Sequence, residues 1–306
     1  MTLSLKNICK SFGSKQVLKD VDFTVSAGES LGYLGRNGAG KTTTIRIITD
    51  IFRPDSGQVL LDGKPIDRNK VSVGYLPEER GLYPKTKVGE QMIYIGELKG
   101  MTQADAKKRA MQLLEEVEGA EYWSKKLDTL SKGNQQKIQL AIAVLNDPDI
   151  VILDEPFSGL DPVNATILKR LILKQVSLGK IVLFSSHQMS YVEEFCEDIV
   201  ILNQGQIVVG GKIRDIKRTY PRNRLAVSPE GDIETFLASL TNMELWHKIT
   251  SNAALKGEEL EITLKDPENK KDLIQMLTAL PMGVDKIHVI EPTLEEIFVE
   301  KAGDQV

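Results

Sequence analysis

The sequence predicts an α/β fold in two parts, a layered first domain and a smaller α+β domain after it. Short apolar runs alternate with helical stretches, a basic stretch follows at 211–224, and the net charge then changes sign. Residues 225–306 carry 16 acidic and 7 basic side chains, whereas residues 1–224 carry 27 acidic and 32 basic ones. We therefore expect domains at 1–215 and 225–306, joined by a basic linker at 216–224.

The first domain opens with two segments of alternating polarity, Leu3–Ile8 and Val17–Val25, which predict an antiparallel edge sheet. An apolar strand then ends near Gly35, and a helix begins near Lys41. The further expected elements are a helical region at 88–120 with a turn at 100–102 and a cap at Thr102, apolar strands at 150–153, 181–184 and 198–202, and a hairpin turn at 203–205.

The stretch at 211–224 is interpreted as a solvated basic linker resting on the acidic domain, with a membrane headgroup contact as the alternative. Pro221 should interrupt any helix there. His247 and His288 fall in predicted strands without partner ligands, so we interpret them as structural. The elements expected in the second domain are strand 225–227, helix 232–240, strands 243–249 and 259–264, helix 269–280, strand 285–290 and helix 293–301.

Composition excludes several classes of protein. The two cysteines, Cys9 and Cys196, are too few for a disulfide framework and are expected in the core of a protein from a reducing compartment. No apolar stretch approaches the roughly 18 residues that a membrane helix needs, and the segment after Met1 lacks the features of a signal peptide. The acidic tail argues against nucleic acid binding. We therefore expect a cytoplasmic protein that meets membranes only through a partner.

Residues 35–42 match the phosphate-binding pattern G-x-x-x-x-G-K-[ST] between an apolar strand and a helix. Glycines there let backbone N–H groups close around phosphate oxygens at a helix N-terminus. Lys41 is expected on the β- and γ-phosphates and the Thr42 hydroxyl on Mg²⁺. The predicted nucleoside triphosphate site consists of Gly35, Arg36, Asn37, Gly38, Ala39, Gly40, Lys41, Thr42 and Thr43.

Two further segments carry chemistry. The apolar strand at 150–153 ends in Asp154, placed to hold magnesium, and Glu155, which points elsewhere and can polarise the attacking water as a general base. Earlier in the chain, Ser131 is a good helix N-cap and Gly133 allows close backbone approach. That segment is either a second anion site or an ordinary capped helix.

These motifs, in this order, resemble the ATPase subunits of ABC transporters over residues 1 to about 215. The resemblance implies an ABC-type nucleotide-binding domain with a RecA-like core, an antiparallel edge sheet and a helical subdomain, using ATP and Mg²⁺. It assigns the signature motif to Ser131, Lys132, Gly133 and Asn134, the D-loop to Asp161, the switch histidine to His187, and the aromatic that stacks on adenine to Phe12.

By the same resemblance, two copies pair head to tail, as a homodimer or with a paralogue. The signature loop of one copy would close on the γ-phosphate held by Lys41 of the other, while Asp161 communicates between the sites. His187 would contact the γ-phosphate and position the water, although without the family a structural histidine is the preferred interpretation. The implied partners are multi-span membrane permease subunits that dock on Glu79–Val88 and hold the chain at the cytoplasmic face of the membrane.

Three positions depart from the family pattern. Glu78 replaces a glutamine and, as a third catalytic residue and a magnesium ligand, should affect rate and metal preference. Lys132 replaces the first signature glycine, and Asn134 replaces the signature glutamine. The segments Tyr75–Tyr83 and Leu130–Lys137, together with Glu291–Phe298, resemble the ATPases of ABC-2-type exporters, especially the sodium-efflux-like subunits.

The expected function is therefore an ATPase that powers such an exporter through closure of the dimer. The alternative is a soluble ABC ATPase in DNA repair, chromosome structure or translation, and a regulatory module with little turnover also stays open. A single nucleotide domain, two cysteines and no sustained heptads disfavour the first of these alternatives.

Overall fold

The computed structural model describes residues 1–79 and 81–303, and the chain divides into two compact units. Unit 1 comprises Met1–Ile213 and Ile297–Val306, and unit 2 comprises Arg214–Glu296. The first boundary thus lies at 213 where 215 was predicted, and the end of the predicted second domain groups with unit 1 instead. Nowhere in the described residues is there a helix with the length and apolarity needed to cross a bilayer.

An antiparallel sheet opens unit 1, in the strand order β2-β1-β4-β5, as the alternating polarity predicted. Leu3 and Leu5 of the first strand and Phe23 and Val25 of the second are buried in one shared core. The strands are β1 (Thr2–Phe12), β2 (Lys15–Ser26), β4 (Ser56–Leu61) and β5 (Lys64–Pro65).

The second sheet of unit 1 has the order β10-β9-β3-β8-β7-β6, parallel except for β10 at one edge. β3, β7 and β8 are buried along their whole length, which explains their uninterrupted apolar runs. These three strands are neighbours, so the segments that follow them meet at the carboxyl edge of the sheet. The strands are β3 (Ser30–Gly35), β6 (Val73–Leu76), β7 (Ile150–Asp154), β8 (Ile181–Ser185), β9 (Asp198–Asn203) and β10 (Gln206–Lys212).

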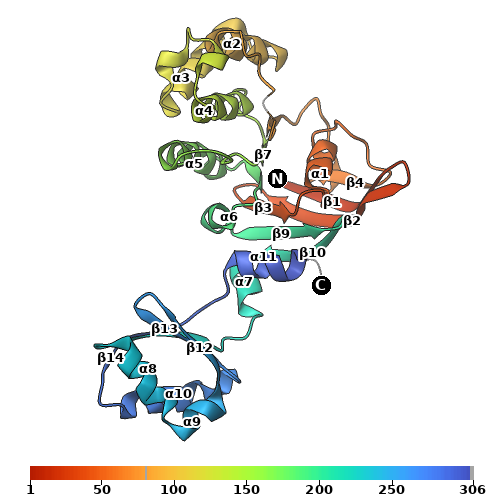
Figure 1. Ribbon diagram of the computed structural model, residues 1–306. Coiled ribbons are helices and arrows are strands. Elements are labelled where there is room, and N and C mark those ends of the chain that lie inside the picture. The colour runs from red at the N-terminus through yellow and green to blue at the C-terminus, as the bar shows by residue number, and fades with distance from the viewer. Residues whose placement is uncertain (80, 304–306) are drawn as a thin grey trace. The chain divides into compact units, whose positions relative to one another are not determined.

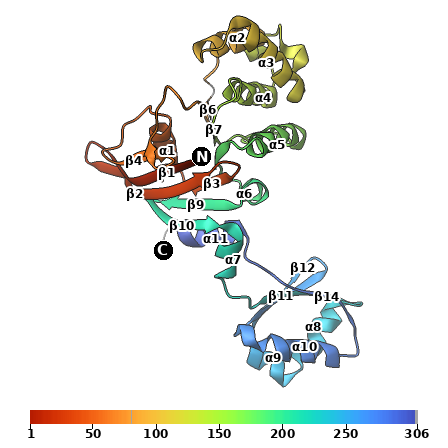
Figure 2. The same cartoon turned by 180° about the vertical axis from the view of Figure 1, so that it is seen from behind.

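Helices of unit 1 flank this sheet, and α2, α3 and α4 gather into a separate helical part beyond β7 (Figures 1 and 2). The predicted region at 88–120 contains two helices divided near Gly100, and the predicted cap is confirmed, because Thr102 Oγ1 accepts from the Asp105 N–H at 3.1 Å. The elements are α1 (Lys41–Ile48), α2 (Val88–Leu98), α3 (Gln103–Glu116), the 3₁₀ turns η1 (Ala120–Tyr122) and η2 (Leu127–Thr129), α4 (Lys132–Ala143), α5 (Pro162–Ser177) and α6 (Met189–Phe195).

Unit 2 is an antiparallel sheet in the order β12-β13-β11-β14 with helices packed on one face. Leu225 and Val227 from the sheet and Phe236 and Leu273 from the helices share its core. The elements are α7 (Ile213–Arg218), β11 (Arg224–Pro229), α8 (Ile233–Thr241), α9 (Glu244–Ile249), β12 (Thr250–Lys256), β13 (Glu259–Leu264), η3 (Pro267–Asn269), α10 (Lys270–Ala279), β14 (Val284–Val289) and α11 (Leu294–Ala302), the last crossing into unit 1.

One predicted element of the second domain is wrong. The strand expected at 243–249 is the helix α9, and the strand β12 follows it. Trp246 and Ile249 are buried in the core of unit 2, and their spacing of three residues places them on one face of a helix. His247 therefore lies on a helix, with a ring nitrogen 2.8 Å from the Thr241 carbonyl oxygen.

The linker and the environment of the two cysteines were also predicted from the sequence. The expected linker at 216–224 begins within α7, which ends at Arg218, ahead of Pro221. Both cysteines are free, with Cys196 buried and Cys9 half-buried, so no disulfide framework exists. Burial raises the pKa of the Cys196 thiol to about 12.

Candidate functional site

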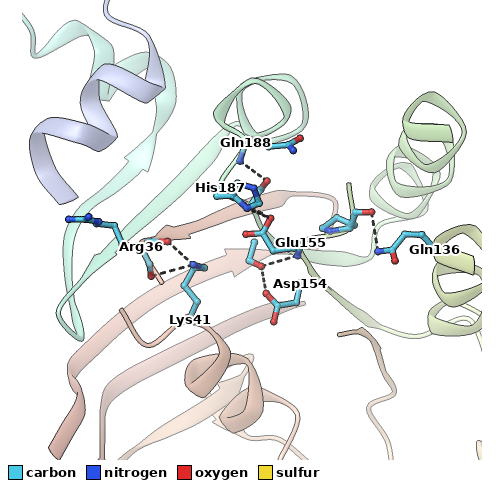
Figure 3. Close-up of polar contacts among 11 residues, drawn as sticks. Arg36, Lys41, Gln136, Asp154, Glu155, His187 and Gln188 are labelled. Atoms are coloured by element: carbon cyan, nitrogen blue, oxygen red, sulfur yellow. Dashed lines mark hydrogen bonds and ion pairs between the residues drawn. The ribbon is translucent and has the colours of Figure 1, made fainter. Parts of the chain in front are cut away.

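The loop between β3 and α1 has a backbone shape that depends on glycine. Gly38 and Gly40 have φ values of 80° and 114°, in a region that other residues rarely adopt. A Cβ atom on Gly40 would also lie 2.6 Å from Cδ2 of Leu18. Lys41 Nζ donates to the Gly35 carbonyl oxygen at 2.6 Å, within the loop (Figure 3). The backbone conformation disfavours a side chain at both positions, and packing on Leu18 adds to this at Gly40.

A cavity of about 1120 Å³ opens over this loop. Its walls contain every residue from Gly35 to Thr43 together with Glu78, Asp154, Glu155 and His187. These residues follow β3, β6, β7 and β8, four strands of one parallel sheet. The structure therefore brings together the side chains predicted for the phosphate loop, the metal and the attacking water.

Asp154 ends β7 with its carboxylate buried beside the loop. Its Oδ1 accepts a hydrogen bond from the Ser185 hydroxyl, and its Oδ2 has no partner within the part of the chain that the structure describes (Figure 3). Burial raises the pKa of this carboxyl, the Ser185 hydrogen bond opposes that shift, and the charges of Glu78 and Glu155 add to it.

This donor set fits magnesium. A buried carboxylate oxygen without a hydrogen-bond donor is a costly feature unless something else satisfies it. Mg²⁺ prefers oxygen ligands, and the Thr42 hydroxyl and the Glu78 carboxylate line the same cavity as Asp154.

Glu155 points away from Asp154, towards His187 (Figure 3). Its backbone has a φ of 51°, an uncommon value for a residue with a side chain. The Glu155 N–H donates to both the carbonyl oxygen and the hydroxyl of Ser185. The carboxylate Oε2 accepts from the His187 N–H at 3.3 Å and lies 2.9 Å from the ring Nδ1 of His187. Two adjacent carboxylates are thus fixed in different directions with different partners.

Sequence reasoning missed the supports behind these residues. Phe157 stacks on Phe195 with ring centroids 5.0 Å apart and on Tyr191 at 4.4 Å, filling the space behind the loop that follows β7. Gln136 of α4 donates to the Pro156 carbonyl oxygen at 3.1 Å, which ties this loop to the helical part (Figure 3). Tyr191 and Phe195 have the i, i+4 spacing of one helix face, but no spacing in the sequence relates Phe157 to them.

The segment around Ser131 lies apart from the cavity. Ser131 caps α4 as predicted, with its hydroxyl accepting from the Asn134 N–H at 3.3 Å. A Cβ on Gly133 would lie 2.7 Å from Asn164 Nδ2, so glycine allows α4 and α5 to approach. Among the described residues that line the cavity, none comes from Ser131–Asn134. Their own chain therefore does not bring them to the phosphate loop.

Asp161 also lies outside the cavity wall formed by the described residues. It caps α5, accepting from the N–H groups of Val163 and Asn164 at 3.0 Å each. These bonds lower the pKa of its carboxyl, the contacts with Asn164 contributing most.

Comparison with known proteins decides the family. Residues 18–158 match the ABC transporter family, and residues 211–302 match the C-terminal domain of DrrA1-3-like ATP-binding proteins. Over 305 residues the chain is 39% identical to the ABC transporter ATP-binding protein YhaQ of Bacillus subtilis, covering 98% of both chains. This chain is an ABC transporter ATP-binding subunit.

Two more comparisons bear on the subunit. The ABC transporter ATP-binding protein NatA of Bacillus subtilis is 32% identical over 70% of this chain and 91% of its own. The dimeric structure of MJ0796, a bacterial ABC transporter cassette, superposes with a TM-score of 0.63 and 26% identity, covering 69% of this chain and 99% of that one. The predicted ABC cassette fold is confirmed.

Phe12, the residue expected to stack on adenine, lies outside the cavity walls that the described residues form. The Phe12 ring packs edge-to-face on Phe52 with centroids 5.3 Å apart, and Lys10 Nζ lies 5.5 Å from its centroid. Phe12 is 45% exposed, and it is absent from the cavity walls that the described residues form. The cavity is also lined by residues that sequence reasoning did not assign, namely Lys15, Val17, Asn203, Gln204 and Phe298.

Proposed function

We propose that this subunit hydrolyses ATP, with Glu155, His187 and Glu78 as its catalytic residues. Lys41 and the N–H groups of residues 35–43 bind the phosphates, and Thr42, Asp154 and Glu78 hold Mg²⁺. When bound, Mg²⁺ neutralises the charge that develops on the β- and γ-phosphates. Glu155 accepts a proton from the attacking water, and His187 orients the carboxylate and contacts the γ-phosphate. The carboxylate at Glu78 adds negative charge at the metal, so we expect an altered rate and metal preference.

The site works in a head-to-tail dimer. The observation that carries this proposal is that Ser131, Lys132, Gly133 and Asn134 lie off the cavity of their own chain while capping a helix whose N-terminus suits an anion. A second copy, identical or paralogous, supplies this segment to the γ-phosphate, and Asp161 connects the two sites. The similar cassette MJ0796 has a dimeric structure, which supports pairing of two copies.

Glu155→Gln tests both the assignment of the general base and the formation of the dimer. The amide keeps the shape of the side chain but cannot accept the proton, so we expect ATP binding to persist while hydrolysis falls by roughly 10²- to 10⁴-fold. With Mg-ATP, light scattering after gel filtration should give twice the 34.0 kDa mass of one chain. Glu115→Gln, at an exposed position of α3, is the matched control and should hydrolyse normally. Hydrolysis by Glu155→Gln at the wild-type rate would refute the assignment of the base.

The dimer powers an ABC-2-type exporter from the cytoplasmic face of the membrane. The match of residues 211–302 to the DrrA1-3-like C-terminal domain supports the exporter group. The sodium-efflux-like subgroup within it rests on the resemblance of Glu291–Phe298. In this arrangement unit 1 is the nucleotide-binding domain, and unit 2 contains the linker and the accessory domain. ATP closes the dimer and hydrolysis reopens it, which moves the permease.

Multi-span permease subunits dock on the segment Glu79–Val88. Gln91, which is buried, holds this segment by accepting from the Tyr83 N–H and donating to the Thr86 carbonyl oxygen, both at 3.0 Å. The Tyr83 side chain is 58% exposed, and an exposed aromatic on a fixed loop suits a protein interface. Arg80 of the same segment lies outside the described residues.

Affinity purification from native membranes tests the transport role. We expect a polytopic membrane protein in stoichiometric amount, identified by mass spectrometry. Recovery with ribosomes or DNA, or from the soluble fraction alone, would refute the exporter and leave the alternative of a soluble ABC ATPase.

A further inference from the structure

Helix α11, from the far end of the chain, reaches the nucleotide cavity. Phe298 lies one turn into this helix and lines the cavity that the phosphate loop also lines. Its side chain is half-buried, whereas its neighbour Val299 is 62% exposed. The helix therefore presents Phe298, and not the next residue, to the cavity.

The second half of α11 is fixed to unit 1. Ile297 and Ala302 are 0% and 1% exposed, and the Asn203 amide donates to the Lys301 carbonyl oxygen at 3.4 Å. Asn203 ends β9, directly before the hairpin turn at Gln204 and Gly205. Phe298 is thus held by a buried face and a hydrogen bond, and not by chance contact.

The same hairpin turn holds the phosphate loop. The Gly205 N–H donates to the Ala39 carbonyl oxygen at 3.0 Å, and the Gly205 carbonyl oxygen accepts from the Lys19 N–H at 2.8 Å. A Cβ on Gly205 would lie 2.3 Å from the Val17 carbonyl oxygen, so the turn packs directly on β2. Phe298, Val17 and the loop are therefore all positioned by contacts with the segment Asn203–Gly205.

The walls of the cavity divide by chemistry. Lys41, Thr42 and the carboxylates of Asp154 and Glu155 line the part that suits phosphates and a metal. Val17 and Phe298 are the large apolar side chains among the residues described for its walls, and neither can bind a phosphate. An aromatic ring gains most from packing on a nucleobase or on the carbon face of a ribose.

We propose that Phe298 is a nucleotide-binding residue that packs on the nucleoside part of ATP. The inference rests on the proposed ATP site and adds to it a contact from the C-terminal helix. It gives the nucleoside an aromatic partner inside the cavity, where Phe12 has its ring against Phe52. Helix α11 begins at Leu294 in unit 2, but Phe298 belongs to its second half, which groups with unit 1 and with the phosphate loop.

Calorimetric titration of the full chain with ATP and with inorganic tripolyphosphate tests the proposal. Phe298→Ala should raise the Kd for ATP roughly tenfold, as expected for a lost aromatic contact with a base, and leave the Kd for tripolyphosphate unchanged. Phe298→Leu, which keeps α11 packed, should show a smaller loss in the same direction. Val299→Ala, on the exposed side of the same helix, is the control and should bind both ligands as wild type does.

The outcomes separate the inference from the site on which it rests. Wild-type affinity for ATP in both Phe298 variants would overturn the inference. An equal loss for ATP and tripolyphosphate would also overturn it, because α11 would then act on the phosphate loop without touching the nucleoside. Failure of the wild-type chain to bind either ligand would overturn the proposed ATP site itself.

Discussion

Ser185→Ala removes a hydroxyl that bonds to the Asp154 carboxylate and to the Glu155 backbone. Ser185 Oγ donates to Asp154 Oδ1 and accepts from the Glu155 N–H at 3.3 Å. The residue is fully buried, so water does not replace the lost hydroxyl. Since Asp154 Oδ2 already lacks a partner in the described part of the chain, the variant leaves a buried carboxylate with neither oxygen hydrogen-bonded.

The magnitude follows from these contacts. A hydrogen bond to a charged group contributes about 1.5 to 3 kcal/mol, and leaving a buried charged group unsatisfied costs at least as much. We therefore expect Ser185→Ala to lower the free energy of unfolding of unit 1 by about 2 kcal/mol. ATP hydrolysis should fall by roughly tenfold, because a 1.4 kcal/mol loss in positioning corresponds to that factor.

Urea unfolding without nucleotide measures the effect. The chain has two tryptophans, Trp123 in unit 1 and Trp246 in unit 2, so a Trp246→Phe background makes fluorescence report on unit 1. Ser186→Ala is a matched control, because the Ser186 hydroxyl is also buried but accepts from a neutral group, the Gln188 N–H, at 3.0 Å. It should cost about 1 kcal/mol. Equal losses in the two variants, or no loss in Ser185→Ala, would refute the reasoning.

Two further predictions concern lysines. Lys41→Ala should weaken ATP binding at least roughly tenfold in calorimetry, since it removes a charged donor to phosphate, and unchanged affinity would contradict the phosphate-loop assignment. Burial lowers the pKa of Lys99 to about 8, below its unfolded value of 10.5, so the unfolded chain binds more protons in that window. The wild-type free energy of unfolding should therefore rise by about 1 to 2 kcal/mol from pH 8 to 9.5. Urea titrations of Lys99→Met should lack this rise. If the rise persists in the variant, Lys99 is not its source.

Local signals in the sequence predicted the elements that local physics controls. The runs at 150–153 and 181–184 predicted buried parallel strands, because a strand covered on both faces needs apolar residues throughout. Ser131 and Thr102 predicted helix starts, because a hydroxyl three residues ahead satisfies a free N–H group. The helix at 244–249 escaped this reasoning, because its short apolar pattern fits a strand until the core of unit 2 is known.

The phosphate loop was determined by the sequence alone, because its glycines, lysine and threonine are contiguous and their spacing is itself the geometry. Only the strand order, which no local pattern specifies, brings four more residues beside this loop: Glu78, Asp154, Glu155 and His187. The position of Phe298 in the cavity depends entirely on the tertiary structure. In sequence it is one apolar residue of an amphipathic helix, and only the packing of α11 against the β9–β10 turn brings its ring to the cavity.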